Sequence, residues 1–187
     1  CQALAQALAP LTTADAVKDA LNQYQDSFLS FYHNLMINKL GLSSSMVNDK
    51  DLYEDLLDLL EGHRIDYTIF FRSLSHYSVG DGPSALSCIE NCADAFVPWF
   101  DRYNERLRSE SQTESNRHKA MCAVNPKFIL RNYLAQVAIQ NSEAGDHSEL
   151  HNVHDILKAP YDEQPDHERY AKEAPDWGRN LQISCSS

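Results

Sequence analysis

The chain alternates between segments whose apolar residues recur every three or four positions and short polar segments that contain glycine or proline. In the first long segment the apolar positions advance in steps of four and three, which places them on one face of a helix. They are Val17, Leu21, Tyr24, Phe28, Phe31 and Leu35. Thr12 and Asp15 form a capping-box pattern at its start, and Gly41 suits the position just past its end. The pattern predicts one amphipathic helix of about 28 residues, roughly 42 Å long.

Further helices are predicted in the middle of the chain. One begins at Asn48 or Asp49 and ends near Gly62, and the next follows Asp66. Another carries a cluster of large apolar residues: Phe96, Trp99, Phe100, Tyr103 and Leu107. Between them, SVGDGPS is predicted to be a loop because of its glycines and proline, and SESQTESN to be a polar connector.

The clearest start signal lies in the second half, where Asn125 precedes Pro126, an N-cap residue followed by proline at the first helical position. The predicted helix buries Ile129, Leu130, Tyr133, Leu134 and Val137 and ends at Gly145. Asp146 and Glu149 form a second capping box. It opens a last helix whose predicted buried stripe is Leu150, Val153 and Leu157.

Prolines at 160, 165 and 175 exclude long helices near the end of the chain. We find no strand pattern before the final residues. The sequence therefore predicts an all-α protein with helices over residues 1–159 and an extended, proline-containing tail over residues 160–187.

Composition narrows the classes of function. The 187 residues include 16 Lys and Arg against 27 Asp and Glu, a formal net charge of −11. A charge of this sign disfavours binding to the backbone of nucleic acids and to anionic membrane surfaces. No apolar run approaches the roughly 18 residues of a membrane span. We therefore expect neither nucleic acid nor membrane among the partners.

Five cysteines are too few and too scattered for a disulfide scaffold, which favours reducing, cytoplasmic surroundings. Cys88 and Cys92 have i,i+4 spacing and could share a metal ion, but no second pair follows. We favour the interpretation that both are small, half-buried residues. Cys1 is either the lipidated first residue of a lipoprotein or an internal position of a longer chain. CQALAQALAP has the character of a helix end, which favours the internal position.

Searches for catalytic patterns give little. No phosphate-binding glycine loop and no kinase-type H-R-D or D-F-G string occurs. His147, His151 and His154 could line up on one helix face and hold zinc, although a solvated helix face explains the same spacing.

Acidic pairs are predicted to lie on solvated helix surfaces. They are Asp49 with Asp51 and Asp55 with Asp58. The residues alone thus indicate a soluble helical domain without a visible active site, and a stand-alone helical protein-interaction module remains an alternative.

Three stretches, NPKFILRNYLAQVAI, GDHSELHNVHDILKAPYDEQP and APDWGRNLQISCSS, together resemble the C-terminal end of the selenoprotein O family, also called YdiU. Upstream, PLTTADAVKDALNQYQDSF, MINKLGL and RIDYTIFFRSLS resemble the same family. The resemblance covers essentially the whole chain and implies the later C-lobe helices of a protein-kinase-like fold, followed by a C-terminal extension.

The resemblance also implies an activity, which is transfer of AMP from ATP, or UMP from UTP, to Ser, Thr or Tyr hydroxyls of other proteins, with Mg²⁺ or Mn²⁺ as cofactor. In the family, the residues that bind nucleotide and metal and catalyse transfer lie upstream of the part that this chain matches. We therefore assign no catalytic, nucleotide-binding or metal-binding residue here. We expect the fragment alone to be inactive, to contact the N-terminal kinase-like portion of the same protein, and to self-associate through bared apolar surface.

One residue does carry over from the resemblance. Family members have selenocysteine or cysteine near this end, and Cys185 is the matching position. The resemblance implies that it pairs reversibly with a cysteine near the upstream active site, which would give redox control. Leu181, Ile183 and Cys185 share parity, so in an extended strand they would point to one face.

Overall fold

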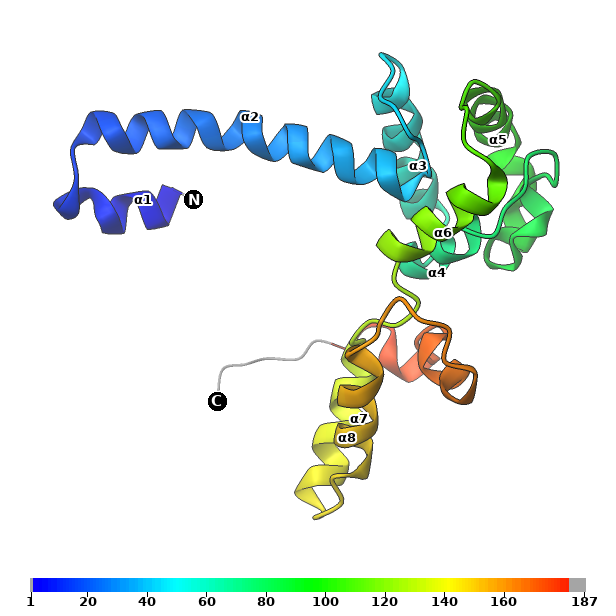
Figure 1. Ribbon diagram of the computed structural model, residues 1–187. Helices are drawn as coiled ribbons and strands as arrows, with labels where there is room; N and C mark the ends of the chain where they lie inside the picture. The colour runs from blue at the N-terminus through cyan, green and yellow to red at the C-terminus, as the bar shows by residue number, and fades with distance from the viewer. Residues whose placement is uncertain (1, 182–187) are drawn as a thin grey trace.

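The computed structural model describes residues 2–181, and within that range the chain is helical and contains no strand (Figure 1). The prediction of an all-α protein is confirmed. The α-helices are α1 Gln2–Leu8, α2 Ala14–Lys39, α3 Asp49–Gly62, α4 Tyr67–Leu74, α5 Ala93–Arg108, α6 Glu114–Val124, α7 Asn132–Glu143 and α8 Ser148–Leu157. Five 3₁₀ segments complete the order: η1 Ala9–Leu11, η2 Pro83–Ala85, η3 Ser87–Cys92, η4 Pro165–Ala171 and η5 Asp176–Gly178.

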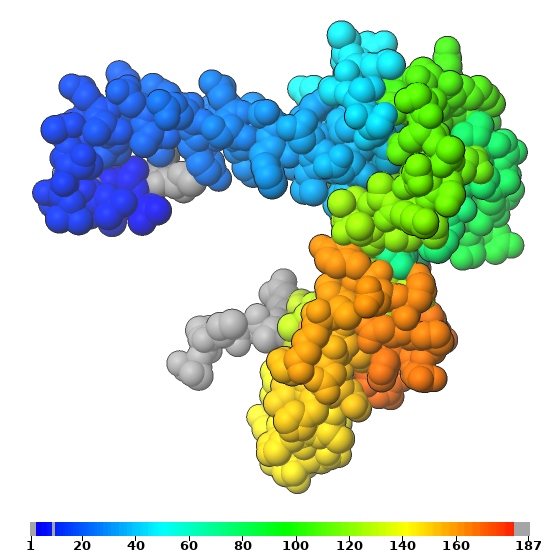
Figure 2. Space-filling view, in the orientation of Figure 1, coloured from blue at the N-terminus to red at the C-terminus, as the bar shows by residue number. Residues whose placement is uncertain are grey.

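The helices form three parts that are distinct in Figures 1 and 2. An arm consists of α2 with α1 folded back along it. A body is formed by α3 to α6 together with the last turn of α2. A C-terminal unit consists of α7, α8 and the 3₁₀ segments that follow, and it lies beside the body below α4 and α6.

Helix α2 begins one residue later than the sequence predicts. Thr13, not Thr12, is the N-cap residue of α2, and its hydroxyl accepts a hydrogen bond from the amide of Ala16 at 3.3 Å. Gly41 follows the helix with φ of +70° and occupies the predicted position past its end.

Only the last turn of α2 enters the core of the body. Met36 and Leu40 are fully buried, whereas Tyr24, Phe28 and Phe31 of the predicted apolar face are 51%, 53% and 74% exposed. The periodicity therefore identifies the apolar face correctly. Its first part, with Val17 and Leu21, is half-buried beside α1, whereas no other described segment covers the face around Phe28 and Phe31.

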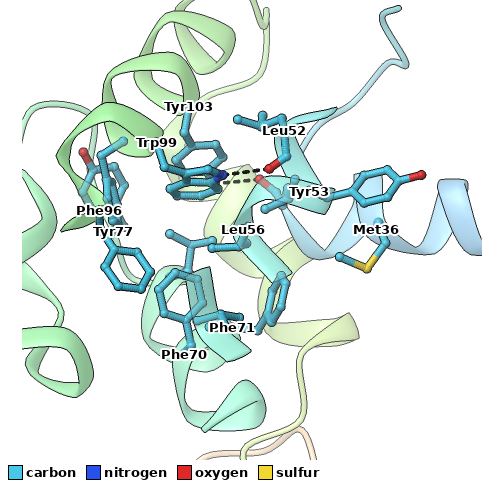
Figure 3. Packing of buried hydrophobic residues seen from close by; sticks show 14 of the residues in the cluster. Met36, Leu52, Tyr53, Leu56, Phe70, Phe71, Tyr77, Phe96, Trp99 and Tyr103 are labelled. Carbon is cyan, nitrogen blue, oxygen red and sulfur yellow. Dashed lines mark hydrogen bonds between the residues drawn. The ribbon is translucent and has the colours of Figure 1, made fainter. Parts of the chain in front are cut away.

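The core of the body is rich in aromatic side chains, several of them from α5 (Figure 3). Trp99 and Tyr103 stack with ring centroids 4.8 Å apart. The indole NH of Trp99 donates to the carbonyl of Leu52 at 2.8 Å, and the hydroxyl of Tyr103 donates to the carbonyl of Leu40 at 2.7 Å. Each ring is thus buried without leaving its polar group unpaired. The predicted apolar cluster of this helix is fully confirmed, because all five of its members are buried.

Two helix boundaries differ from the prediction, one at the start of α6 and one at the start of α7. The expected connector SESQTESN gives way to helix α6 at Glu114, because Thr113 is an N-cap residue that accepts from the amide of Asn116. The helix expected at Asn125 and Pro126 begins only at Asn132. The physical reason is that the Asn125 side chain is committed to distant partners and is not available to cap a helix.

The C-terminal unit packs around a small core of its own. That core consists of Phe128, Leu134, Val153, Ile156 and Tyr170. Contrary to the prediction, Leu130 and Leu150 are 56% and 48% exposed. Tyr170 belongs to η4, so the proline-rich stretch contributes to this core through a short 3₁₀ segment, which agrees with the absence of long helices there.

The capping box predicted at the start of α8 does not form. The N-cap residue is His147, and the Asp146 carboxylate before it accepts from the amide of Ser148 at 2.9 Å, as in an Asx turn. Glu149 instead binds Arg169 and the hydroxyl of Tyr170. Ile183 and Cys185 lie outside the described residues, so their shared direction stays a prediction, as does the division of the chain after residue 159. Among the described helices, none is long and apolar enough to cross a membrane.

Candidate functional site

Polar side chains gather where the end of α4, the helix α6 and the last turn of α2 meet. They form a buried hydrogen-bond network around Asn125 and, beside it, a cluster of two histidines and a cysteine. This region also faces the C-terminal unit. It combines a buried lysine, an arginine, two histidines and a cysteine.

The Asn125 amide connects three segments. Its carbonyl oxygen accepts from the ammonium of Lys39 at 3.0 Å, and its NH₂ group donates to the Lys39 carbonyl at 3.0 Å and to the Ser75 hydroxyl at 3.2 Å. The Lys39 ammonium also lies 5.0 Å from the ring centroid of Phe71, a cation–π distance. Burial lowers the pKa of Lys39, and these contacts are what hold a cation there.

Arg72 extends the network into the C-terminal unit. Its guanidinium donates to the carbonyls of Cys122 and Asn125 at 3.1 and 3.0 Å, and it forms an ion pair with Glu163. Lys127 binds the other oxygen of the same carboxylate. Hydrogen bonds from Lys127 and Arg72 lower the pKa of Glu163 to about 2. The ion pair between Arg72 and Glu163 thus links the C-terminal unit to α4.

His76, His118 and Cys122 form a cluster next to this ion pair. One potential ligand atom from each residue lies within 4.8 Å of the other two. The imidazole rings are 4.4 Å apart between centroids, and the thiol sulfur lies 3.8 and 3.9 Å from the two ring nitrogens of His118. His118 and Cys122 are one turn apart on α6, and His76 follows the C-cap of α4.

A second buried network corrects the prediction for the acidic pairs. Asp49 is 1% exposed, and its carboxylate accepts from the guanidinium of Arg106 at 2.7 Å. The same guanidinium binds Glu110 at 2.6 Å. Periodicity could not reveal this because the partner comes from α5. Asp51, Asp55 and Asp58 are exposed, as predicted.

The hollow around this second network does not fit a nucleotide. Its lining includes three carboxylates, from Asp49, Asp51 and Glu105, and two arginines. Arg106 is already bound by two carboxylates, and Arg102 pairs with Asp55 at 2.7 Å. A polyphosphate would meet surplus negative charge and no free cation. ATP or UTP with its metal ion is therefore not assigned to this hollow.

The structure separates the other residues that sequence analysis singled out. His147, His151 and His154 are all exposed, and the described part of the chain contains a single cluster of metal-ligand type, the one at His76. Cys88 and Cys92 are half-buried and pack against the core of the body, as the favoured interpretation holds. Cys185, the expected redox residue, lies outside the described residues.

The cluster at His76 is not among the sites predicted from the sequence. The i,i+4 spacing of His118 and Cys122 on one helix was a readable signal, equal to that of Cys88 and Cys92. His76 could not be added to the pair from the sequence, because it joins them only through the packing of α4 on α6.

The described residues form an all-α module with two buried polar networks and an arm whose apolar stripe is partly exposed. The hollow around Asp49 and Arg106 does not fit a nucleotide. A family model described as "Protein adenylyltransferase SelO" matches residues 1–158. The chain belongs to this family, and the resemblance noted in the sequence is confirmed.

Relatives in bacteria agree with the assignment. The chain is 44% identical over 192 residues to the "Protein nucleotidyltransferase YdiU" of Pseudomonas fluorescens (strain SBW25), which covers 99% of this chain and 38% of that protein. It is 40% identical over 185 residues to the protein of the same name in Pseudomonas aeruginosa (strain LESB58), again 99% of this chain and 38% of the relative. For Salmonella heidelberg (strain SL476) the identity is 41% over 186 residues, 100% of this chain and 38% of the relative. The chain thus spans well under half the length of these relatives and aligns to their C-terminal part.

Proposed function

We propose that this chain is the C-terminal part of a protein nucleotidyltransferase that transfers AMP from ATP, or UMP from UTP, to Ser, Thr or Tyr hydroxyls of other proteins. The observation that carries the proposal is the match to the SelO family over residues 1–158, together with relatives named as protein nucleotidyltransferases along nearly the whole chain. We further propose the bacterial cytoplasm as its location.

Within such an enzyme, this chain would act as a helical support. The rings of Tyr24, Phe28 and Tyr32 follow one another along α2 with centroids 6.1 and 6.2 Å apart, and the first two are about half exposed. A continuous apolar stripe of this kind is normally covered. The relatives contain further sequence beyond the 38% that matches, and we propose that their kinase-like portion packs on this arm.

The chemistry of transfer would then belong to residues outside this chain. Mg²⁺ or Mn²⁺ would neutralise charge on the phosphates while a carboxylate positions the acceptor hydroxyl. In this chain the arginines of the charged hollow are paired with carboxylates, which supports the proposal that the fragment alone is inactive.

The proposal is tested by incubating labelled ATP or UTP, Mg²⁺ or Mn²⁺ and a bacterial protein extract with either the full-length protein or this chain. We expect label on proteins only with the full-length protein. Label transfer by neither would overturn the proposal and would favour the alternative, a helical interaction module without catalysis.

The terminal cysteine gives a second test of the full-length protein. We propose that Cys185 pairs reversibly with an upstream cysteine near the active site, so that transfer depends on reductant. Cys185→Ser should remove that dependence, whereas Cys88→Ser, which changes a half-buried cysteine of the body, should keep it. The measurement is the transfer rate with and without reductant. An unchanged reductant dependence in Cys185→Ser would contradict the redox role.

A further inference from the structure

The cluster of His76, His118 and Cys122 has the composition of a transition-metal site. Two imidazoles and one thiolate are ligands that Zn²⁺ and related ions prefer over oxygen-seeking ions such as Mg²⁺. Three protein ligands with a fourth position left to water is the usual arrangement of a zinc site open to solvent. His76 is exposed, so the fourth position would face solvent.

The distances are close to those of a bound ion. Zinc bonds of roughly 2.0–2.3 Å in a tetrahedron place ligand atoms roughly 3.3–3.6 Å apart. Here the sulfur of Cys122 is 3.8 and 3.9 Å from the two ring nitrogens of His118, and one candidate ligand atom from each of the three residues lies within 4.8 Å of the other two. The ligand atoms would have to approach one another by about 1 Å. Rotation of the exposed His76 ring and of the Cys122 thiol about χ1 can supply this shift.

The backbone already orients His118 as a metal ligand. Its Nδ1 lies 2.8 Å from the carbonyl of Ser75, and a carbonyl can only accept, so Nδ1 carries the proton. The lone pair is then on Nε2. A histidine that donates one ring NH to a backbone carbonyl while its other nitrogen binds the ion is the common arrangement in metal sites.

The electrostatic surroundings permit a bound cation. Arg72 and Lys127 lie near the cluster, but both are paired with Glu163, and Lys127 also binds Glu168. Burial raises the pKa of the Cys122 thiol. The thiol proton would leave to solvent when an ion binds, because thiolate is the form that coordinates.

From these contacts we propose that His76, His118 and Cys122 bind one divalent transition-metal ion of the Zn²⁺ type, with solvent at the fourth position. The ion would join the turn after α4 to helix α6, next to the hydrogen bond from Arg72 to the Cys122 carbonyl. The ion would therefore stabilise the packing of α4 on α6, next to Arg72, whose ion pair with Glu163 holds the C-terminal unit. The proposal does not depend on the transfer reaction.

Cobalt titration tests the proposal on the reduced chain without an affinity tag. We expect Co²⁺ to produce the visible bands of a tetrahedral ion and a thiolate-to-cobalt charge-transfer band, both saturating at one equivalent. Zn²⁺ should abolish the bands and raise the melting temperature. A wild-type chain that shows no thiolate-to-cobalt band would overturn the proposal.

Variants assign the bands to this cluster. His76→Ala changes an exposed ring, so the fold should persist by circular dichroism, and affinity should fall more than about a hundredfold, beyond the effect of losing an outer-shell partner. Cys122→Ser should remove the charge-transfer band. His151→Ala and Cys88→Ser, a surface histidine and a half-buried cysteine outside the cluster, are the matched controls and should bind normally. Full binding by both His76→Ala and Cys122→Ser would overturn the assignment.

Discussion

At the scale of single residues, the side-chain amide of Asn125 joins the end of α2, the turn after α4 and the end of α6. All of its hydrogen bonds go to groups distant in the sequence, and it is fully buried. Removing a buried, hydrogen-bonded polar group costs stability, because its partners are left buried without a hydrogen bond.

We therefore predict that Asn125→Ala lowers the free energy of unfolding by about 2–4 kcal/mol, since the Lys39 ammonium and the Ser75 hydroxyl would be left buried without this partner. Asn152→Ala, at an exposed position of α8, should change it by less than about 0.5 kcal/mol. Urea unfolding of both variants measures the difference. Equal values would show that the Asn125 network does not stabilise the fold.

Glu163 leads to a prediction about pH. Its pKa falls from 4.5 to about 2 in the folded chain, mainly through hydrogen bonds from Lys127 and Arg72. The stabilisation is present above the unfolded pKa and is lost as pH falls through the folded pKa. Its carboxylate is 53% exposed, so the effect is reduced by solvent screening.

The stability of the wild-type chain should thus decline more steeply than that of Glu163→Gln between about pH 5 and pH 2. Urea unfolding at several pH values measures the two slopes. Glu61→Gln, at an exposed position on α3, should follow the wild type. Parallel curves for wild type and Glu163→Gln would contradict the role of this ion pair.

At the scale of elements, the end of α2 depends on a glycine for two reasons. Gly41 has φ of +70°, and a Cβ at this position would lie 2.5 Å from the sulfur of Met121 on α6. The positive φ is a property of the turn after α2, whereas the close approach to Met121 depends on how α6 packs against that turn. Gly145 follows α7 with φ of +88° but has no atom within 4 Å of such a Cβ.

The two glycines therefore form a matched pair. Gly145→Ala should cost about 1 kcal/mol from backbone conformation alone. Gly41→Ala should cost about 2–4 kcal/mol, because overpacking against α6 adds to the same conformational term. Thermal or urea unfolding of both variants measures the difference, and equal losses would mean that α6 yields without cost.

The molecule as a whole combines a well-packed body with an arm whose apolar stripe is exposed from Tyr24 to Phe31. Phe31 is 74% exposed and Phe28 53%. In water an apolar stripe of this length favours contact with another copy when its usual cover is missing.

We predict that the isolated chain self-associates as its concentration rises. The double variant Phe28→Glu and Phe31→Glu should stay monomeric, because charges on the stripe oppose burial. The matched control, Asn22→Glu with Ser30→Glu, adds the same charge at exposed polar positions of α2 and should associate like the wild type. Sedimentation across a range of concentrations measures this, and a wild-type chain that stays monomeric would contradict the prediction.

Features that depend on near neighbours in the chain could be predicted from the sequence. The cap at Asp66 is confirmed by its hydrogen bond from Ile69, and Gly41 and the aromatic face of α5 were equally readable, because capping and periodicity act within a few residues. The family was also readable, since its motifs are contiguous stretches.

Which polar residues are buried, and which apolar residues stay exposed, depends on packing between distant segments. Asp49 is buried because Arg106 reaches it from α5, and Asn125 caps no helix because Lys39 and Ser75 take its amide. The stripe around Phe28 stays exposed because no described segment packs on it. Each outcome depends on contacts between segments distant in the sequence, whose free energy exceeds the local preferences on which sequence patterns rest.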